Sequence, residues 1–599
     1  MKNHFQKIQA ILTKGDRRQF YVLFLVMLAM GVLEVGGIGA IMPFMAAVSD
    51  MDGMLENKQL HYLYELFGFE SKETFVIFLG SAVLTLLITR NILFALSYWL
   101  LSRFSFMWRH HLSEKLLRKY LMQPYTFFLS NNTLELKRNV TNEVIRLVSG
   151  VIIPGLQLLT KAIIAFFIIT LLVVINPFVA IMVAVIFGGS YAALYGLVFR
   201  KLNRLSQHAN DSRRAQFKLA GEAFEGIKQL KLSGRENHFI DEYSALSHKN
   251  AAIETVSRTI SQLPRYGIET VAVSTIMLFI LYLVGTEQDV SSWMPLLAVY
   301  VIAGYRMLPA LQVIFSGLTT IRYNLITLDS LYKDFTGLET VNPHHPGMLC
   351  TRASFHPLRT IKLSNIDFRY PQCSDYAIQT MNLVVDRNTT VGLVGPTGSG
   401  KTTVVDIVLG LLRPVSGELA VNDIVVTPDN VRGWQQCIGY VPQQIYLLDD
   451  TIAKNIAFGV PDSEIDCVAL EEVARIANVH DYVVNELPNG YETIVGQRGL
   501  RLSGGQQQRI GIARALYHKP DILVLDEATS ALDSVTENVV MNAINQLSHK
   551  LTIIMIAHRL NTVKNCDIIH YIDRGRIVSS GTYSELSGSC LHFQKMVKA

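Results

Sequence analysis

The sequence predicts a multi-domain membrane protein in which a helical domain with six membrane spans is followed by an α/β domain. Half of the 599 residues are hydrophobic, only 17% are charged, and the mean hydropathy is +0.28. This balance is typical of membrane spans joined to a soluble part. The long apolar stretches lie in the first half, whereas the second half is more polar and shows short buried strands.

Apolar stretches long enough to cross a bilayer recur six times in the first half. The third and fourth are separated by Asn176 and Pro177, a pair that favours a tight turn between helices. The predicted membrane domain comprises residues 1–335, with spans at about 21–48, 75–101, 140–175, 178–200, 255–285 and 292–320.

The distribution of charge predicts the orientation of these spans. Basic residues concentrate ahead of the first span, between the second and third, and between the fourth and fifth. The other two loops are mainly acidic, with Asp50 and Glu56 in one and Glu287 and Asp289 in the other. Because loops rich in lysine and arginine stay on the cytoplasmic side, both termini are expected there. The polar start of the chain has no cleavage site and is interpreted as a cytoplasmic lead-in.

The two longest basic loops carry a helical pattern. Residues 107–121 and 213–230 show helical periodicity, which predicts that the spans continue as helices into the cytosol. Each helix then turns at a short segment, near Pro124 and near Gly234. The alternative is a pair of solvated loops, although loops of this length without secondary structure are uncommon.

Charged residues inside the predicted spans are functional candidates, because a charge in the bilayer interior is costly. Arginine binds phosphate through paired hydrogen bonds, so three arginines on three spans suggest a pocket for an anion. The equally weighted alternative is internal pairing, of Arg265 with Glu269 or of Glu34 with a neighbouring arginine. The charged positions are Glu34, Arg90, Lys161, Arg265, Glu269 and Arg306.

The composition argues against two classes of protein. The six cysteines form no C-x-x-C pair, so neither a zinc site nor a disulfide framework is indicated. Isolated cysteines of this kind suit a reducing cytosol. The net charge of +5 is not concentrated in a block that would indicate nucleic-acid binding.

The second half is organised around a glycine-rich loop of the pattern G-x-x-x-x-G-K-[ST]. An apolar run predicted to be a strand precedes it and a predicted helix follows it, which is the context that supports the motif. Backbone N–H groups, the helix N-terminus and a lysine are suited to hold the phosphates of ATP. The predicted nucleotide-binding residues here are Gly395, Pro396, Thr397, Gly398, Ser399, Gly400, Lys401, Thr402 and Thr403.

Three further segments supply the groups that ATP hydrolysis needs. Tyr370 closes an early strand and offers an aromatic face to adenine. Gln443 follows another strand and brings an amide near metal and water. Asp526 and Glu527 end a buried strand, where Asp526 is placed to hold Mg²⁺ with Gln443 and the hydroxyl of Thr402. Glu527 is placed to polarise the attacking water.

Two more segments complete the predicted site. His558 ends a buried strand and is a candidate contact of the γ-phosphate. A second anion-binding helix N-terminus is formed by Ser503, Gly504, Gly505 and Gln506. Each segment alone has a structural explanation, such as a polar group at a strand end. Together and in this order, they predict ATP hydrolysis.

The motifs GPTGSGKT, VPQ, LSGGQ, LVLDE and IAH, with SALD after the carboxylates, resemble the nucleotide-binding domain of ABC transporters. The resemblance covers residues 360–599, behind a linker at 336–359. Six spans ahead of one such domain resemble an exporter-type half-transporter, of the type I exporter or type IV ABC fold. In that family the turns near Pro124 and Gly234 match coupling helices. Gln497, where exporters usually carry glutamate, is a departure that bears on coupling and not on hydrolysis.

The same resemblance implies a partner and two cofactors. Two ATP molecules with Mg²⁺ are expected between the phosphate loop of one copy and the LSGGQ segment of another. The presence of both Glu527 and His558 favours a homodimer over a heterodimer.

In the membrane half, residues 33–44, 263–269, 303–309 and 321–324 resemble bacterial flippases of the PglK type. That family moves lipid-linked oligosaccharides for protein N-glycosylation. The resemblance implies that Arg90, Arg265 and Arg306 engage the pyrophosphate of the carrier lipid, and that residues 60–69 form an external helix. It also implies a multi-pass protein of the bacterial inner membrane. From their pattern alone, residues 60–69 are equally an interfacial stretch or a packing cap.

The predicted function is ATP-driven flipping of a polyprenyl-diphosphate-linked oligosaccharide or related glycolipid, for protein glycosylation or surface polysaccharide assembly. The alternative is a lipid A, multidrug or peptide exporter of the same architecture. A non-transporting ABC ATPase acting in translation or DNA repair is disfavoured by the six spans. The expected partners are a second copy, the glycolipid and membrane lipids, without nucleic acid.

Overall fold

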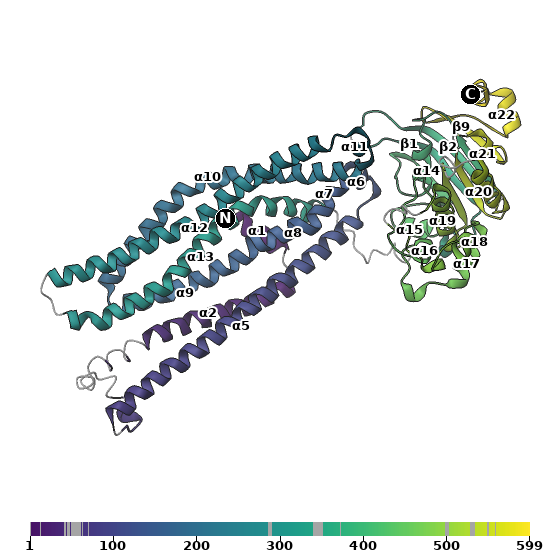
Figure 1. Ribbon diagram of the computed structural model, residues 1–599. Helices are drawn as coiled ribbons and strands as arrows, with labels where there is room; N and C mark the ends of the chain where they lie inside the picture. The colour runs from purple at the N-terminus through teal and green to yellow at the C-terminus, as the bar shows by residue number, and fades with distance from the viewer. Residues whose placement is uncertain are drawn as a thin grey trace. The chain divides into compact units, whose positions relative to one another are not determined.

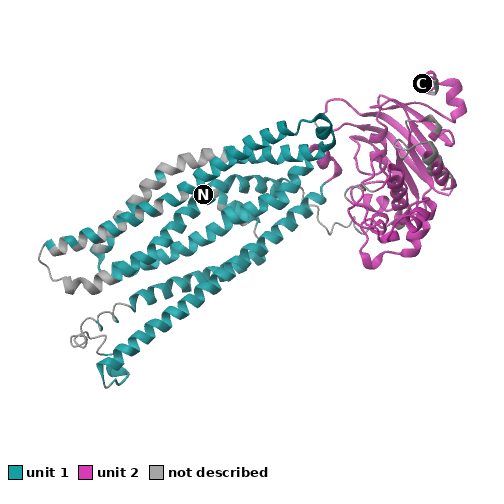
Figure 2. Ribbon diagram, in the orientation of Figure 1, with its two compact units in different colours: residues 1–123, 131–340 teal, residues 124–130, 341–599 magenta. Residues whose placement is uncertain are grey.

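The computed structural model describes residues 2–11, 13–40, 44, 48, 62, 64–69, 71–285, 290–338, 352–371, 373–496, 502–527, 534–547, 550–557 and 559–598. The chain divides into two compact units (Figure 2). Unit 1 comprises Met1–Gln123 and Asn131–Thr340, and unit 2 comprises Pro124–Ser130 and Val341–Ala599. The short segment Pro124–Ser130 therefore groups with the second half of the chain, although it lies within the first half of the sequence.

The described part of unit 1 is helical (Figure 1). Its long helices far exceed the roughly 20 residues that cross the hydrocarbon of a bilayer, as α5 has 50 residues. The helices are α1 Lys2–Ile11, α2 Lys14–Gly39, α5 Lys72–Leu121, α7 Thr133–Arg138, α8 Val144–Leu147, α9 Ile153–Ile175, α10 Pro177–Glu225, α11 Ile227–Ser233, α12 Glu236–Gly285 and α13 Val290–Gly337, with π-helical turns η2 Asn139–Glu143 and η3 Val148–Ile152.

Four helical segments of the described residues are long and apolar enough to cross a membrane. They are Lys14–Gly39, Lys72–Leu121, Thr133–Ile175 and Val299–Gly337, which correspond to predicted spans one, two, three and six. Predicted spans four and five fall on α10 and α12, where many side chains lie outside the description. The prediction of six spans therefore stays a prediction for those two.

Local sequence explains where these helices begin and how closely they approach. Thr13 begins α2 with a capping box, because its hydroxyl accepts from the N–H of Asp16 and the Asp16 carboxylate accepts from the N–H of Thr13. In η3, a Cβ on Gly150 would lie 2.6 Å from the side chain of Asn324 in α13. Only glycine therefore allows the helix of Thr133–Ile175 to pack this closely on α13.

The predicted cytosolic helices are present, with one difference. Helix α5 continues without a break to Leu121, as the periodicity of residues 107–121 predicted. The predicted helix at 213–230 is interrupted, because α10 ends at Glu225 and α11 begins after Gly226. The two predicted turns are short helices: α6, Tyr125–Ser130, and α11, which ends at Gly234 in the left-handed conformation that glycine favours.

The described residues of the aromatic stretch in the first outer loop pack locally. The rings of Tyr64 and Phe69 lie 5.4 and 5.3 Å from the ring of Phe75, which is fully buried. Tyr62 and Phe67 remain exposed. The packing cap is therefore the interpretation that the described part of this stretch favours.

Unit 2 contains two sheets in its described part. A four-stranded antiparallel sheet has the order β2-β1-β4-β5, and a six-stranded sheet has the order β10-β9-β3-β8-β7-β6. The strands are β1 Thr360–Phe368, β2 Ile378–Asp386, β3 Thr390–Val394, β4 Ser416–Val421, β5 Ile424–Val425, β6 Ile438–Val441, β7 Ile522–Asp526, β8 Thr552–Ile556, β9 Ile568–Asp573 and β10 Arg576–Gly581.

Helices cover the larger sheet, which explains its composition. Strands β3, β7 and β8 are buried along their whole length, as expected for parallel strands covered on both faces. The helices are α14 Lys401–Val408, α15 Val431–Gln435, α16 Ile452–Ile456, α17 Cys467–Ile476, α18 His480–Asn485, α19 Gly504–Tyr517, α20 Ser534–Leu547, α21 Leu560–Val563, α22 Tyr583–Ser589 and α23 Leu591–Lys598. The first strand begins at Thr360, the predicted start of the α/β domain, and α13 runs two residues past the predicted boundary at 335.

Candidate functional site

The predicted nucleotide-binding groups meet because of the strand order in the larger sheet. Strands β3, β8, β7 and β6 are parallel neighbours in that order, so their carboxyl ends form one edge. The glycine-rich loop follows β3, Asp526 and Glu527 end β7, and Gln443 follows β6. His558, after β8, lies outside the described residues.

Two glycines of the loop are required by its shape. Gly395 has a φ of 152°, and a Cβ there would overlap the carbonyl oxygen of Ile572. Gly400 has a φ of 103°, and its Cβ would lie 2.8 Å from Ile378 Cδ1 and 3.0 Å from the Ala377 carbonyl oxygen. The loop can therefore turn into α14 with its backbone exposed to a ligand only if both residues are glycine.

The loop holds polar groups that suit phosphate. Lys401 is 5% exposed, and its Nζ donates to the carbonyl oxygens of Gly395 and Pro396 at 2.9 Å each. Burial lowers the pKa of Lys401, against the opposing charges of Glu527 and Asp526. The buried hydroxyl of Ser399 has no hydrogen-bond partner among the described residues. Such an orphaned donor beside a helix N-terminus fits an anion.

The predicted adenine contact lies beside this loop. The hydroxyl of Tyr370 is 3.0 Å from the hydroxyl of Thr403, in the first turn of α14. The ring of Phe368 packs edge-on against Tyr370, with centroids 5.0 Å apart. These two contacts fix the aromatic face next to the phosphate loop.

The carboxylates at the end of β7 are held in place by their neighbours. Asp526 is 6% exposed. The amide of Gln443 donates to Glu527 Oε2 at 2.6 Å, and the N–H of Glu527 donates to the Ile556 carbonyl at 3.2 Å. Glu527 has a φ of 48°, a left-handed conformation that is costly for a residue with a side chain. Strain of this kind persists where the surroundings determine the conformation, as they do in active sites.

Sequence reasoning missed two groups beside Asp526. Burial raises the pKa of Asp406 to about 6, and the charge of Asp526 adds to the shift. Burial and the same two carboxylates raise the pKa of Tyr440, whose hydroxyl is hydrogen-bonded to Asp526. A signal for Asp406 was present, since it is the one acidic residue in the mainly apolar helix that follows the loop. Tyr125 of α6 lies near the same carboxyl, and burial followed by the charges of Asp406 and Tyr370 raises the pKa of Tyr125.

The second predicted anion site has the expected local form. Ser503 caps α19, where its hydroxyl accepts from the N–H of Gln506 and Gln506 Oε1 accepts from the N–H of Ser503. In the part of the chain that the structure describes, no hydrogen bond joins Ser503, Gly504, Gly505 or Gln506 to the phosphate loop. Gln497 and residues 530–533 lie outside the described residues.

In unit 1, the structure brings together charges from three helices. Glu34 of α2 is 2% exposed. Arg90 of α5 donates through Nε to Glu34 Oε2, and Arg306 Nη1 of α13 lies 3.5 Å from Glu34 Oε1. The predicted pairing of Glu34 with an arginine is therefore present, and the same pairing places two predicted substrate residues side by side. The side chain of Arg265 lies outside the described residues.

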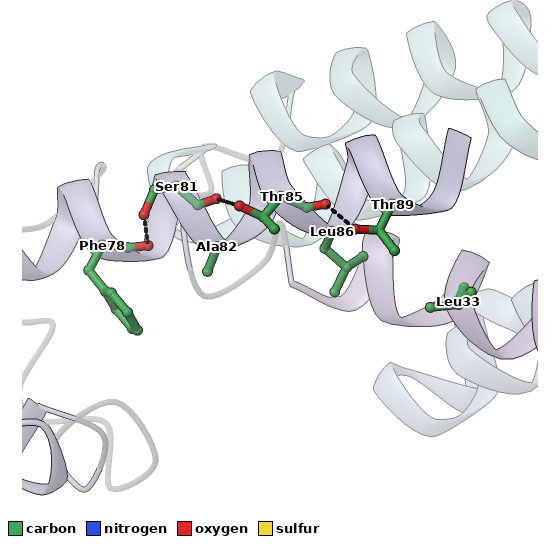
Figure 3. A pocket seen from close by; sticks show the side chains of 7 residues that line it. All are labelled: Leu33, Phe78, Ser81, Ala82, Thr85, Leu86 and Thr89. Atoms are coloured by element: carbon green, nitrogen blue, oxygen red, sulfur yellow. Dashed lines mark hydrogen bonds between the residues drawn. The ribbon is translucent and has the colours of Figure 1, made fainter. Parts of the chain in front are cut away.

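A groove of about 480 Å³ lies between α2 and α5. Figure 3 shows three hydroxyls along one face of α5, each donating to a carbonyl of its own helix: Ser81 to Phe78 at 2.8 Å, Thr85 to Ser81 at 2.8 Å and Thr89 to Thr85 at 2.9 Å. Because these hydroxyls are satisfied internally, the groove presents a mainly apolar surface. Its lining residues are Leu33, Phe78, Ser81, Ala82, Thr85, Leu86 and Thr89.

Two family descriptions match the two halves of the chain. Residues 40–295 match the ABC transporter transmembrane region, and residues 378–530 match the ABC transporter ATPase family. The first match covers most of the helical unit, and the second includes the phosphate loop and the carboxylates at the sheet edge.

Named relatives support the same family. An ATP-dependent lipid A-core flippase of Ralstonia nicotianae is 30% identical over 501 residues, which cover 80% of this chain and 79% of that protein. One of Saccharophagus degradans is 34% identical over 374 residues, or 61% of each chain. Other matched proteins are covered over as little as 18% of their own length. These bacterial relatives are named lipid A-core flippases, and none of them is named for the PglK type that the membrane stretches predicted.

A solved structure has the same fold along almost the whole chain. The structure of a bacterial Atm1-family ABC exporter with ATP bound superposes with a TM-score of 0.78 at 21% identity, covering 97% of this chain and 98% of that one. The predicted fold class, a transmembrane helical domain followed by an α/β nucleotide-binding domain, is confirmed. The chain thus belongs to the ABC transporters, whose ATPase domain is coupled to transport, and it has the organisation of an exporter-type half-transporter.

Proposed function

We propose that this chain uses ATP hydrolysis to move an amphipathic lipid with a phosphate-bearing head group across a membrane, with a glycolipid of the lipid A type as the first candidate. The observation that carries the proposal is the meeting of Arg90 and Arg306, from two helices, at the buried carboxylate of Glu34. Cations inside a membrane domain are costly and mark candidate functional sites, and arginine binds phosphate oxygens in pairs. The names of the bacterial relatives support a lipid substrate.

The groove beside these charges supports an amphipathic substrate. Leu86 lines the groove and lies one helical turn before Arg90 on α5, and the side chains of both lie within 4.0 Å of a Cβ placed on Gly37 of α2. An apolar surface thus adjoins Arg90 where these two helices meet. A lipid whose head group meets the arginines would find room for an apolar chain along α5.

Each residue at the sheet edge has a proposed task in ATP hydrolysis. Lys401 exchanges its two carbonyl acceptors for phosphate oxygens, and the unpartnered hydroxyl of Ser399 donates to the same phosphates. Glu527 polarises the attacking water, and the 2.6 Å hydrogen bond from Gln443 holds its carboxylate in position. Tyr370 stacks on adenine, and His558 is the proposed contact of the γ-phosphate.

The proposed Mg²⁺ ligands are the carboxylate of Asp526, the hydroxyl of Thr402 and the amide oxygen of Gln443. All three are hard oxygen donors of the kind that Mg²⁺ prefers. Among the described residues, no group of three His, Cys, Asp or Glu side chains could hold a metal by itself, which suits an ion that is bound together with phosphates. When bound, Mg²⁺ would neutralise charge on the β- and γ-phosphates.

The proposed working unit is a homodimer. Ser503, Gly504, Gly505 and Gln506 form a capped helix N-terminus that binds no group of its own chain's phosphate loop in the described residues. This arrangement supports the expectation that each ATP lies between the loop of one copy and this segment of the other. The proposed location is the bacterial inner membrane with both termini in the cytoplasm, supported by the basic loops.

A second candidate substrate is a polyprenyl-diphosphate-linked oligosaccharide, for protein glycosylation or surface polysaccharide assembly. The specific observation in its favour is that Arg90 and Arg306, predicted to engage a diphosphate, lie at one carboxylate. A neutral drug gives no reason for these cations, so the multidrug alternative is the less favoured one.

Lipid movement by the full-length protein in liposomes tests the proposal. Three fluorescent lipids are compared: a lipid A type with phosphates, a polyprenyl-diphosphate-linked sugar, and a glycolipid without phosphate. We expect ATP-dependent movement of a phosphate-bearing lipid, no movement of the neutral one, and none in Glu527→Gln. Which phosphate lipid moves decides between the two candidates. Equal movement of the neutral glycolipid, or no ATP-dependent movement of any lipid, would overturn the proposal.

A further inference from the structure

A fourth charge lies beside Glu34, Arg90 and Arg306. Lys161 of α9 is half-buried, and its Nζ lies 5.5 Å from the centre of the Phe94 ring. The guanidinium of Arg90 lies 4.6 Å from the centre of the same ring. Two cations thus share one aromatic ring, and both lie within electrostatic range of Glu34. We call Glu34, Arg90, Lys161 and Arg306 the charge cluster.

The charge cluster draws one residue from each of four helices: α2, α5, α9 and α13. An apolar cluster adjoins it, because Ile38 lies one turn beyond Glu34, Ile164 one turn beyond Lys161, and Ala303 one turn before Arg306. Phe94 packs against the same apolar residues. The charges therefore lie beside an apolar layer, which solvates an unbalanced charge poorly.

Each oxygen of the Glu34 carboxylate already has an arginine partner. Arg90 bonds its Oε2 and Arg306 pairs with its Oε1. Among the ion pairs of the described residues, none supplies a carboxylate to Lys161. Three cations thus face one carboxylate, which leaves two positive charges unbalanced in the described part of the cluster. The cluster attracts an anion that enters here, and the bound anion offsets the free-energy cost of keeping these cations away from water.

We propose that Lys161 is a further substrate-binding residue, and that it selects a head group with two negative charges over a head group with one. A head group with two negative charges, together with Glu34, neutralises the three cations of the cluster. A head group with one negative charge leaves one positive charge unbalanced. Glu34 is then a positioning residue, which holds the arginines of α5 and α13 toward one point. The inference rests on the proposed function, because it assigns a role within the same site.

Lipid affinity in the full-length protein tests the role of Lys161. Binding of undecaprenyl diphosphate and undecaprenyl monophosphate is measured by native mass spectrometry for the wild type, Lys161→Met and Lys161→Arg. We expect Lys161→Met to weaken binding of the diphosphate about tenfold, the effect of one lost charge contact, and binding of the monophosphate less than threefold. Lys161→Arg keeps the second charge and should retain the preference for the diphosphate.

Arg103→Met is the matched control. Arg103 is an exposed cation that lies 5.3 Å from the centre of the Trp99 ring on the same α5 helix, outside the charge cluster. Its loss should leave the ratio of the two affinities at the wild-type value. A tenfold loss in Arg103→Met as well would indicate general attraction of anionic lipid and overturn the assignment.

The remaining outcomes separate this inference from the proposed function. If the wild type binds phosphate lipids and Lys161→Met binds each of them with the wild-type affinity, the role of Lys161 is wrong and the proposed function stands. If the wild-type protein binds neither the undecaprenyl lipids nor a bisphosphorylated lipid A analogue, the proposed function fails and the inference fails with it. A bisphosphorylated lipid A analogue serves as a second dianion, and only a preference that holds for both dianions supports selection by charge.

Discussion

The sheet edge of unit 2 and the charge cluster of unit 1 both gather charged side chains, but they do so in different ways. At the sheet edge, the groups follow the ends of adjacent parallel strands and are bound by one another, as Gln443 is to Glu527. In the charge cluster, each residue comes from a separate helix, two arginines share one carboxylate, and Lys161 lies over the Phe94 ring that Arg90 also contacts. The first arrangement is built into the strand order, whereas the second depends on how four helices lie against one another.

This difference indicates which site is fixed and which can change. The polar groups at the sheet edge are held by hydrogen bonds within one domain, which also maintain the strained backbone of Glu527. The charge cluster changes whenever one of its helices shifts, because no two of its residues share a helix. A fixed site suits a constant ligand such as ATP, and an adjustable one suits a substrate that must be bound and then released.

The largest expected effect lies at the sheet edge. Glu527→Gln should lower ATP turnover by about 100-fold or more, because it removes the proposed general base, while ATP binding persists. The measurement is phosphate release alongside binding of a fluorescent ATP analogue. The control is Glu418→Gln, an exposed carboxylate of β4. If turnover in Glu527→Gln stays within threefold of wild type, Glu527 is not the base.

The glycine at the junction between the phosphate loop and α14 provides a second test of the site in unit 2. Gly400→Ala should weaken ATP binding at least about tenfold, because its Cβ would lie 2.8 Å from Ile378 Cδ1 at a φ of 103°. The control is Gly588→Ala, where no atom lies within 4 Å of the new Cβ. Equal ATP affinity in both variants, measured by equilibrium binding, would show that the loop tolerates a side chain.

A double-mutant cycle tests whether the charge cluster acts as a unit. Arg90→Met and Glu34→Gln should show a coupling of about 1–2 kcal/mol, because either substitution alone already removes the Arg90–Glu34 ion pair, so the second has no pair left to remove. The exposed pair Arg118 and Glu114, with 3.2 Å between charged atoms on the surface of α5, is the control. Its coupling should stay below about 0.5 kcal/mol.

The coupling is obtained from the apparent free energy of unfolding of the full-length protein in detergent, for the wild type, both single variants and the double variant. Additive effects for Arg90 and Glu34 would mean that the two side chains are independent. The cluster would then not be a defined site.

The smallest expected effect concerns the pH dependence of unit 2. The pKa of Asp406 is about 6 in the folded protein and 3.8 when unperturbed, so the folded state holds this proton over a range in which the unfolded state has lost it. Stability therefore falls as pH rises from about 4 to about 6, and the loss persists above that range. About 1.36 kcal/mol per pKa unit sets an upper limit near 3 kcal/mol, and solvent screening of the half-buried carboxyl reduces the expected loss to about 1 kcal/mol.

Asp406→Asn should therefore raise the unfolding midpoint of the nucleotide-free, full-length protein at pH 7.5 and leave it unchanged near pH 4. Asp386→Asn, at the exposed end of β2, is the control. A rise of equal size at both pH values would mean that the effect comes from packing and not from the charge of Asp406.

The two sites were also predictable to different degrees. The phosphate loop, Gln443, Asp526 and Glu527 could be assigned from the sequence, because motif residues at parallel strand ends must meet at one edge. The strain at Glu527 and the neighbours Asp406 and Tyr440 could not, since they depend on how side chains pack around Asp526.

In the membrane half, the sequence identified charged residues without their geometry. It named Glu34, Arg90 and Arg306 as candidates and left pairing and substrate binding as equal alternatives. The structure shows the pairing, in which Glu34 brings the two arginines together, and substrate binding by these arginines stays a proposal. Sequence spacing could not reveal this, since 216 residues separate Arg90 from Arg306 and only the packing of α2, α5 and α13 joins them.

The central claim is that a phosphate-bearing head group binds at the charge cluster, and photocrosslinking tests it most directly. A lipid with a photoreactive group next to its phosphate is bound to the full-length protein, and the labelled peptides are mapped by mass spectrometry. We predict labels within one helical turn of Glu34, Arg90, Lys161 and Arg306, and a marked loss of these labels in Arg306→Met. Labels that lie only on other helices, or labels at the cluster that Arg306→Met does not reduce, would contradict the claim.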